Sequence, residues 1–297
     1  MDAAATLCPQ CGAPVTPASR FAREATCGFC RTLVRLDPSI VRAAPYQAAL
    51  LRWERPTEGA IRLESGWWTL RAPLARGSRT DLWHVERART PTERGILKLS
   101  RDESSTSEAD VLELLARSGS PVIGSLIPAI IASGPVTEGP HAGKRAVIVR
   151  AAPTFAADLT AVRRVASGGI DPASTIWMWR RILEILRILV ECGISYHAVE
   201  PAHFVAERNQ HGLRLVGFGN ARLETGGVGR AVCASARMLR ELSAPPPDAL
   251  AELWAHVEAD PSIGRSAAGI LDLHRRVGDL AKTAFGPPHF RPLPLPA

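Results

Sequence analysis

The stretch Ile194–Leu223, ISYHAVEPAHFVAERNQHGLRLVGFGNARL, decides the fold of the chain. It contains two short apolar segments, Phe204–Ala206 and Leu213–Val216, which are separated by a polar turn. Apolar segments of this length around a polar turn predict a β-hairpin. A loop that contains Pro201 leads into the hairpin, and a Gly-Phe-Gly turn at residues 217–219 leads out of it.

A loop, a hairpin and a Gly-Phe-Gly turn in this order resemble the catalytic centre of a protein kinase. In that family the motif H-R-D-L-x-x-x-N is followed by a hairpin and then by D-F-G, because phosphoryl transfer needs a base near the hydroxyl and ligands for magnesium. Alignment on Pro201 and on Phe218-Gly219 needs no gap. Tyr196 then stands for the histidine of the motif, His197 for its arginine and Ala198 for the aspartate base. Glu200 replaces the usual lysine, His203 the metal-binding asparagine and Gly217 the metal-binding aspartate.

Every group of the motif that handles a proton or a metal is therefore missing. The resemblance implies a pseudokinase, a protein with the kinase fold and no phosphotransferase activity, that acts as a scaffold or a regulator. Its fold class would be α+β and two-lobed, with an antiparallel sheet plus a helix in the first lobe and a mainly helical second lobe. The resemblance is to a pseudokinase of bacterial type, and we attribute the richness in Ala, Arg and Pro to genome composition.

Four cysteines near the N-terminus form two C-x-x-C pairs, Cys8/Cys11 and Cys27/Cys30, with fifteen residues between the pairs. This spacing predicts a zinc ribbon in which four thiolates close a tetrahedral structural site. Two disulfides or a redox C-x-x-C are the alternatives. The expected cytoplasmic location disfavours disulfides, and the lack of a surrounding βαβ pattern disfavours a redox site. We expect Gly12 and Gly28 to relieve the tight backbone of the two knuckles.

The 297 residues accommodate a two-lobed domain and a small appendage. The sequence predicts a zinc ribbon over 1–36, a linker over 37–59 with a short helix at 46–53, a kinase-like domain over 60–285 with lobes 60–150 and 151–285, and a proline-rich tail over 286–297. The longest apolar region, Pro121–Val136, is interrupted by Gly124, Pro128 and Gly134 and is too short for a membrane span. No secretory signal is recognised at the N-terminus, so we expect a cytoplasmic protein.

The first lobe is expected from period-two segments that begin at Ala60: IRLESGWWTLRAPLA, TDLWHVERA and RGILKLS. Two more strands are predicted at Ser125–Ser133 and Arg145–Arg150. Gly77 lies where kinases have a glycine-rich loop, and it serves either such a phosphate loop or an ordinary hairpin turn. Residues 151–155 would form the hinge.

The resemblance also places a nucleotide-binding lysine and its partner. Ile96–Leu99 matches the V-A-I-K strand, so Lys98 would reach the phosphates of ATP. The segment that follows predicts a helix capped at residues 105–107, and Glu108 is the expected ion-pair partner of Lys98, with Glu113 as the alternative. Alternatively, Lys98 and Glu108 are two separate charges on the solvent-exposed surface.

The second lobe is predicted to consist of helices. Asp171 and Pro172 give the start signals of a long core helix, since an acidic cap is followed by proline at the first helical position. The helices are expected at Ala173–Cys192, Ala231–Leu242, Pro247–Glu258 and Ile263–Phe285. Cys192 and Cys233 lie in apolar helical patterns and are expected to be buried.

Two other functions compete with the inactive scaffold that docks a protein partner through the ribbon. One is an ATP-binding phosphotransferase in which Asp81, Glu200 or Glu224 supplies a displaced carboxylate. The other is a nucleic-acid-binding ribbon, suggested by Arg20, Arg23, Arg31 and Arg35 and by the net charge of +7. However, the arginines are distributed along the whole chain, which favours a solvated surface over one nucleic-acid patch.

Overall fold

The computed structural model falls into two units, Met1–Arg55 and Pro56–Ala297, and each is treated by itself below. It describes residues 6–18, 22, 24–36, 59–77, 79–88, 90–100, 107–119, 122–151, 155–197, 199–207, 212–224, 226–287, 289 and 291–296. The predicted helix at residues 46–53 and nearly all of the predicted linker lie outside these residues.

The described residues of the first unit form two small hairpins. Strand β1 (Thr6–Leu7) pairs with β2 (Pro14–Val15), and β3 (Glu24–Thr26) pairs with β4 (Leu33–Arg35), both antiparallel. Its small core combines cysteine and aliphatic side chains, namely Cys8, Val15, Cys27 and Val34. So small a core contributes little stability by itself, which makes the unit dependent on its cysteines.

The two knuckles between these strands have the same backbone hydrogen bonds. Gly12 N–H donates to the Cys8 carbonyl at 2.8 Å, and Arg31 N–H donates to the Cys27 carbonyl at 3.0 Å. Both Gly12 (φ 74°) and Arg31 (φ 64°) adopt the left-handed conformation. Gly28 does not have a positive φ, so its expected role was wrong; the second knuckle turns at Arg31 instead. A residue with a Cβ atom is disfavoured in this conformation because the Cβ crowds the backbone.

The second unit begins with a curled antiparallel sheet of six strands in the order β5-β6-β7-β8-β10-β9. The strands are β5 (Ala60–Leu63), β6 (Gly66–Arg76), β7 (Thr80–Arg87), β8 (Thr90–Ser100), β9 (Ile130–Pro135) and β10 (Arg145–Arg150). Side chains from all six of these strands form a core of their own around Trp68 and Ile148.

Two details of the sheet differ from the prediction. The segment read as one strand breaks at residues 64–65, where Gly66 (φ 120°) starts β6, so the sheet gains a strand. The predicted strand Ser125–Ser133 is a short helix α3 (Ile123–Leu126) followed by β9. Short apolar runs do not distinguish a helical turn from a strand, because both bury them.

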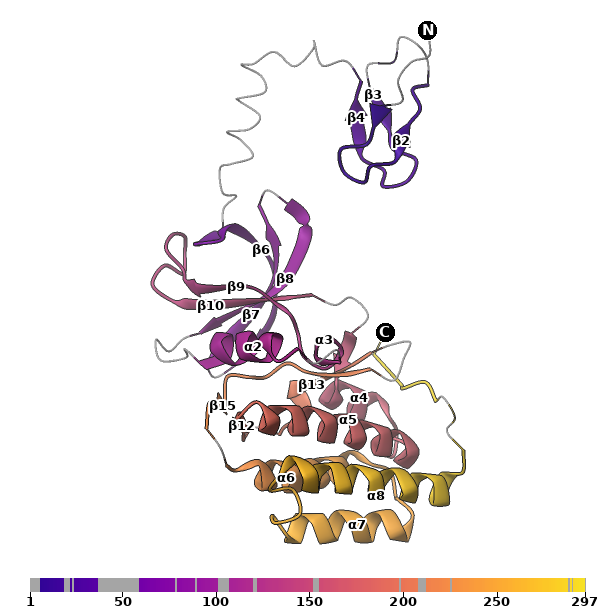
Figure 1. Ribbon diagram of the computed structural model, residues 1–297. Helices are drawn as coiled ribbons and strands as arrows, with labels where there is room; N and C mark the ends of the chain where they lie inside the picture. Colours follow the sequence, from indigo (N-terminus) through magenta and orange to yellow (C-terminus); the bar gives the residue numbers. More distant parts are fainter. Residues whose placement is uncertain are drawn as a thin grey trace. The chain divides into compact units, whose positions relative to one another are not determined.

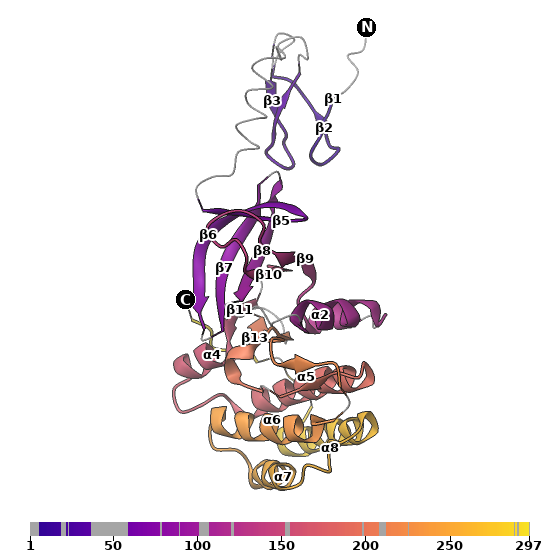
Figure 2. The ribbon, with the colours of Figure 1, turned by 90° about the vertical axis from the view of Figure 1, so that its left-hand side faces the viewer.

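The second unit also contains several helices. Helix α2 (Ser107–Arg117) lies beside the sheet, and α5 (Pro172–Glu191), α6 (Val228–Leu242), α7 (Asp248–Ala259) and α8 (Ala267–Phe285) are stacked below it (Figures 1 and 2). A further short helix, α4 (Leu159–Val165), follows strand β11 (Phe155–Asp158). The Asp171 cap is confirmed, since its side chain accepts a hydrogen bond from Ser174 N at 3.1 Å.

The decisive stretch forms the predicted hairpin. Strands β13 (Phe204–Glu207) and β14 (Leu213–Leu215) pair with β11 in a three-stranded sheet, preceded by the 3-10 turn η2 (Pro201–His203). A two-stranded pair that was not expected, β12 (Ser195–Tyr196) with β15 (Ala221–Arg222), closes the loop. The described residues of the proline-rich tail contact the second unit. Arg291 lies 3.2 Å from Asp171, and Leu293 and Leu295 pack against the main core.

The strained turn at Arg31 gives a first prediction. Replacing Arg31 by Gly should stabilise the first unit by about 1 kcal/mol, because glycine adopts this conformation without steric cost. Hydrogen exchange of the amides of residues 24–35 in the full chain would measure the change. Gly12→Ala, at the matching turn, should shift exchange in the opposite direction. Unchanged or faster exchange in Arg31→Gly would contradict the assignment of strain.

Candidate functional site

The four predicted cysteines converge in the first unit. The Sγ atoms of Cys8, Cys11, Cys27 and Cys30 lie within 4.8 Å of one another, so they could hold a metal ion. The Thr32 hydroxyl, 3.2 Å from Cys30 Sγ, and the Thr32 backbone hold the pKa of the Cys30 thiol down at about 6. Metal binding requires thiolates, so this hydrogen bond prepares one ligand at neutral pH.

The predicted ion pair between Lys98 and Glu108 is present in the second unit. Lys98 Nζ on β8 lies 2.5 Å from Glu108 Oε1 in the first turn of α2, and it also donates to the Val216 carbonyl just after β14. The two side chains are only 10% and 11% exposed. The ammonium group is therefore held by two internal acceptors from two other elements.

The next feature is a tight contact between His203 and Gly217. Val216 N donates to the His203 carbonyl at 2.8 Å, which brings residue 217 against the end of η2. A Cβ atom on residue 217 would lie 2.5 Å from His203 Cγ and 2.9 Å from Nε2, closer than van der Waals contact permits. The imidazole therefore fills the space into which a side chain at position 217 would project.

Tyr196 fixes the position of that imidazole. Its hydroxyl lies 3.2 Å from His203 Nδ1, and its ring packs against Phe218 at 6.3 Å between centroids. The phenol is fully buried, and burial, with help from the negative charges of Glu200 and Glu108, raises its pKa above the usual range. Tyr196 stays protonated and neutral, and it acts as a hydrogen-bonding anchor for His203.

A second polar network lies around His197. Ser195 Oγ is 2.9 Å from Glu224 Oε1 and 3.1 Å from His197 Nε2, and Nε2 is 3.4 Å from Glu224 Oε1. Ser195 is fully buried, so its hydroxyl is not available to a substrate as a nucleophile. The Ser195 hydroxyl and then His197 lower the pKa of Glu224, which keeps the carboxylate charged in this network.

Two of the carboxylates proposed as replacements are engaged by neighbouring side chains. Asp81 on β7 forms an ion pair with Arg76 at 3.7 Å, and Glu224 is engaged by Ser195 and His197. Among the residues that the structure describes, the four cysteines are the one group of three or more Cys, His or acidic side chains arranged for a metal ion.

The remaining predicted positions are placed as follows. Gly77 directly follows β6 in the turn that leads to β7. Its N–H donates to the Thr80 carbonyl at 2.9 Å, which is the geometry of a hairpin turn. Ala198 and most of the predicted hinge lie outside the described residues. Cys233 is buried and donates to the Val257 carbonyl, whereas Cys192 is partly exposed, contrary to expectation.

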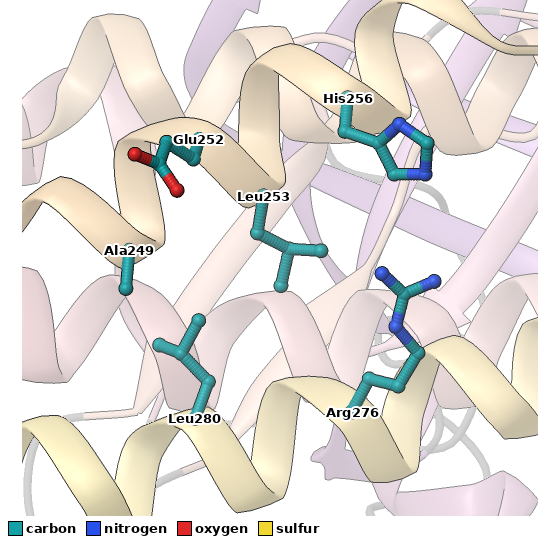
Figure 3. Close-up of a pocket in the computed structure, with 6 residues that line it drawn as sticks. All are labelled: Ala249, Glu252, Leu253, His256, Arg276 and Leu280. Carbon is teal, nitrogen blue, oxygen red and sulfur yellow. The ribbon is translucent and has the colours of Figure 1, made fainter.

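A surface groove of about 410 Å³ runs between α7 and α8. Leu253 and Leu280 form its middle, with His256 and Arg276 at one end and Glu252 toward the other (Figure 3). It contains one carboxylate and no cysteine, serine or threonine among its lining residues. The groove therefore lacks the nucleophile or paired carboxylates of a catalytic site.

Comparison with models of known protein families and with curated proteins finds no match. No helix in the described part of the chain is long and apolar enough to cross a membrane.

Two parts of the site escaped the sequence analysis. The Val216 carbonyl has no signal in the sequence, because any residue supplies a backbone oxygen. The contact between His203 and Gly217 could have been suspected, since glycine beside a bulky residue across a hairpin often permits close approach. Residues 203 and 217 were instead interpreted one at a time, each as a position without the expected metal ligand.

The contact between His203 and Gly217 yields a second prediction. Gly217→Asp should destabilise the chain by about 1–3 kcal/mol, because the new side chain collides with the imidazole. Combining it with His203→Ala should recover much of that loss, giving a coupling of about 1 kcal/mol or more in a double-mutant cycle measured by urea unfolding.

Gly219→Asp is the matched control, since a Cβ atom there meets nothing within 4 Å. It should change the free energy of unfolding little. Strictly additive effects of Gly217→Asp and His203→Ala would show that the imidazole does not occupy the space.

Proposed function

We propose that residues 60–285 form a two-lobed kinase-like domain that has lost phosphotransfer and acts as a scaffold or regulatory protein. In this proposal the six-stranded sheet with α2 is the first lobe, and the stacked helices are the second (Figure 1). The first unit is a zinc ribbon that docks the protein to a partner. The proposal rests on the resemblance together with the contacts described above.

One observation supports the proposed loss of phosphotransfer. By the resemblance, positions 203 and 217 would supply the two metal ligands, but here one is an imidazole that fills the space of the other. Restoring Asp at position 217 alone would therefore produce a collision and not a magnesium site. Phosphoryl transfer depends on magnesium to neutralise developing charge, so the loss of both ligands removes its main electrostatic support.

The Lys98–Glu108 ion pair by itself is equally compatible with an active kinase, in which the corresponding pair must be in place. The Val216 carbonyl is a second acceptor for the nearly buried ammonium group. Breaking a buried ion pair is costly, because it leaves an uncompensated charge. The pair therefore acts as a structural link between β8, α2 and the hairpin.

Zinc is the metal that best suits the first unit. Soft thiolate ligands favour zinc, and four sulfurs in a tetrahedral set leave no open position for a substrate. Its role would be structural, since metal binding supplies the folding free energy that the small core lacks.

The inactive-scaffold proposal predicts that nucleotide leaves thermal stability unchanged. The unfolding midpoint of the full chain should not shift with ATP or ADP at about millimolar concentration, with or without magnesium, because a ligand that binds the native state must raise the midpoint. Differential scanning fluorimetry measures this shift.

A magnesium-dependent rise in the midpoint would overturn the loss of the metal site and favour the relocated-carboxylate phosphotransferase. Transfer of the γ-phosphate to any acceptor, abolished by Lys98→Ala, would do the same. A shift with nucleotide alone would contradict the purely structural role of Lys98.

Metal removal tests the ribbon. The purified chain should contain one zinc per molecule by atomic emission, and a chelator should abolish amide protection in residues 6–36 while leaving the unit 56–297 protected. Cys8→Ser should lose zinc. Cys192→Ser, at a cysteine outside the cluster, is the matched control and should retain it. Full amide protection after zinc is stripped would contradict a structural role for the metal.

A further inference from the structure

The first unit exposes large apolar side chains that its own fold does not use. Phe29 is 83% exposed, Leu7 is 61% exposed and Leu33 is 58% exposed, and Phe29 is the most exposed large apolar side chain among the described residues. Single exposed apolar residues are normal on a protein surface. Three in so short a segment are a candidate interaction surface.

Two of these residues are directly attached to the cysteine cluster. Leu7 precedes Cys8 and Phe29 precedes Cys30, and the sulfurs of these two cysteines are 3.5 Å apart. Leu33 follows in the same hairpin as Phe29. Because the cluster fixes both knuckles, the apolar side chains are presented on a frame that is rigid when the metal is bound. We call Leu7, Phe29, Arg31 and Leu33 the knuckle surface.

Arg31 is the second observation. It is the one non-glycine residue with a positive φ among the described residues, at a turn where the first knuckle has glycine. Strain of this kind is often found where a side chain serves a function. Its guanidinium has no ion pair within the described residues. Arg31 lies two residues from Phe29, and its backbone conformation costs stability. This arrangement fits a partner that presents an acidic side chain next to an apolar one.

We infer that the knuckle surface binds an extended protein segment in which Leu or aromatic residues alternate with Asp or Glu. This inference deepens the proposed docking role of the ribbon and rests on it. Phe29 and the two leucines would bury apolar side chains of the partner, and Arg31 would pair with a carboxylate, with two guanidinium N–H groups donating to its oxygens. Aromatic and arginine residues together are typical of the side chains that dominate binding energy.

Charge and side-chain type favour this occupant over two others. Residues 1–36 contain four arginines against two acidic residues, and the whole chain carries +7, so a second copy of the chain would be repelled. A single-stranded nucleic acid would also be attracted, but it binds through stacked aromatic rings. Only one of the three exposed apolar side chains is aromatic, and leucine does not stack with bases.

The experiment is selection from a random-peptide display library on the immobilised, zinc-loaded full chain, with parallel selections on three variants. Phe29→Ser removes the apolar anchor, and Arg31→Gly removes the guanidinium at a turn that glycine accepts. Leu74→Ser, on β6 and 50% exposed, is the matched control outside the ribbon. Affinities of the enriched peptides are then measured by fluorescence anisotropy at low and high salt.

The enriched peptides should combine acidic with Leu or aromatic residues. Phe29→Ser should weaken binding by about tenfold or more, and Arg31→Gly by a few-fold to about tenfold with a reduced dependence on salt. Leu74→Ser should bind like the wild type. No enrichment, basic or uncharged peptides, equal binding by Phe29→Ser, or displacement of the peptide by oligouridine RNA would each overturn the inference.

The result is independent of the catalytic question. If the peptide selection fails while nucleotide still gives no shift, the inactive scaffold stands and this docking surface is wrong. If the selection succeeds while magnesium and ATP raise the unfolding midpoint, the docking surface stands and the loss of phosphotransfer is wrong.

Discussion

The second unit depends on a nearly buried ion pair, that of Lys98 with Glu108. Three elements meet at its ammonium group: β8 carries the lysine, α2 carries Glu108 ten residues later, and the hairpin offers the Val216 carbonyl, 118 residues after the lysine. An ammonium group out of water must have partners with good geometry, or it destabilises the fold by several kcal/mol. The charge therefore fixes the position of α2 on the sheet and of the hairpin below it, and this requirement restricts how the parts can pack.

The same requirement is met by the polar groups of the decisive stretch. The remaining groups of the decisive stretch satisfy one another. Tyr196 holds His203, and His203 fills the space beside Gly217. Near it, Ser195 and His197 hold Glu224, and the imidazole of His197 packs so closely on Gly227 that a Cβ atom there would lie 2.5 Å from Cε1. Hydrogen bonds between protein groups thus keep these polar atoms paired.

Sequence patterns predicted the features that depend on local chemistry. Cysteine spacing identified the cluster, the Asp171-Pro172 pair identified the start of α5, and apolar segments around a polar turn identified the β13–β14 hairpin. The partner of Lys98 followed from the resemblance to kinases. Features that depend on close approach in space were not predicted. The left-handed turn at Arg31, the break before β6 and the contact between His203 and Gly217 depend on atoms that are adjacent only in the folded chain.

Gly217 and Arg31 differ in how the residue type relates to the local structure. At Gly217 the imidazole of His203 occupies the space of a side chain, so the introduction of a side chain there needs a second change at His203. At Arg31 a side chain is present although glycine would be more stable, and a single substitution could relieve the strain. Selection for stability alone would preserve the first arrangement and remove the second. The strain at Arg31, close to an exposed Phe29, is therefore accounted for by the proposed binding role of the first unit and not by folding alone.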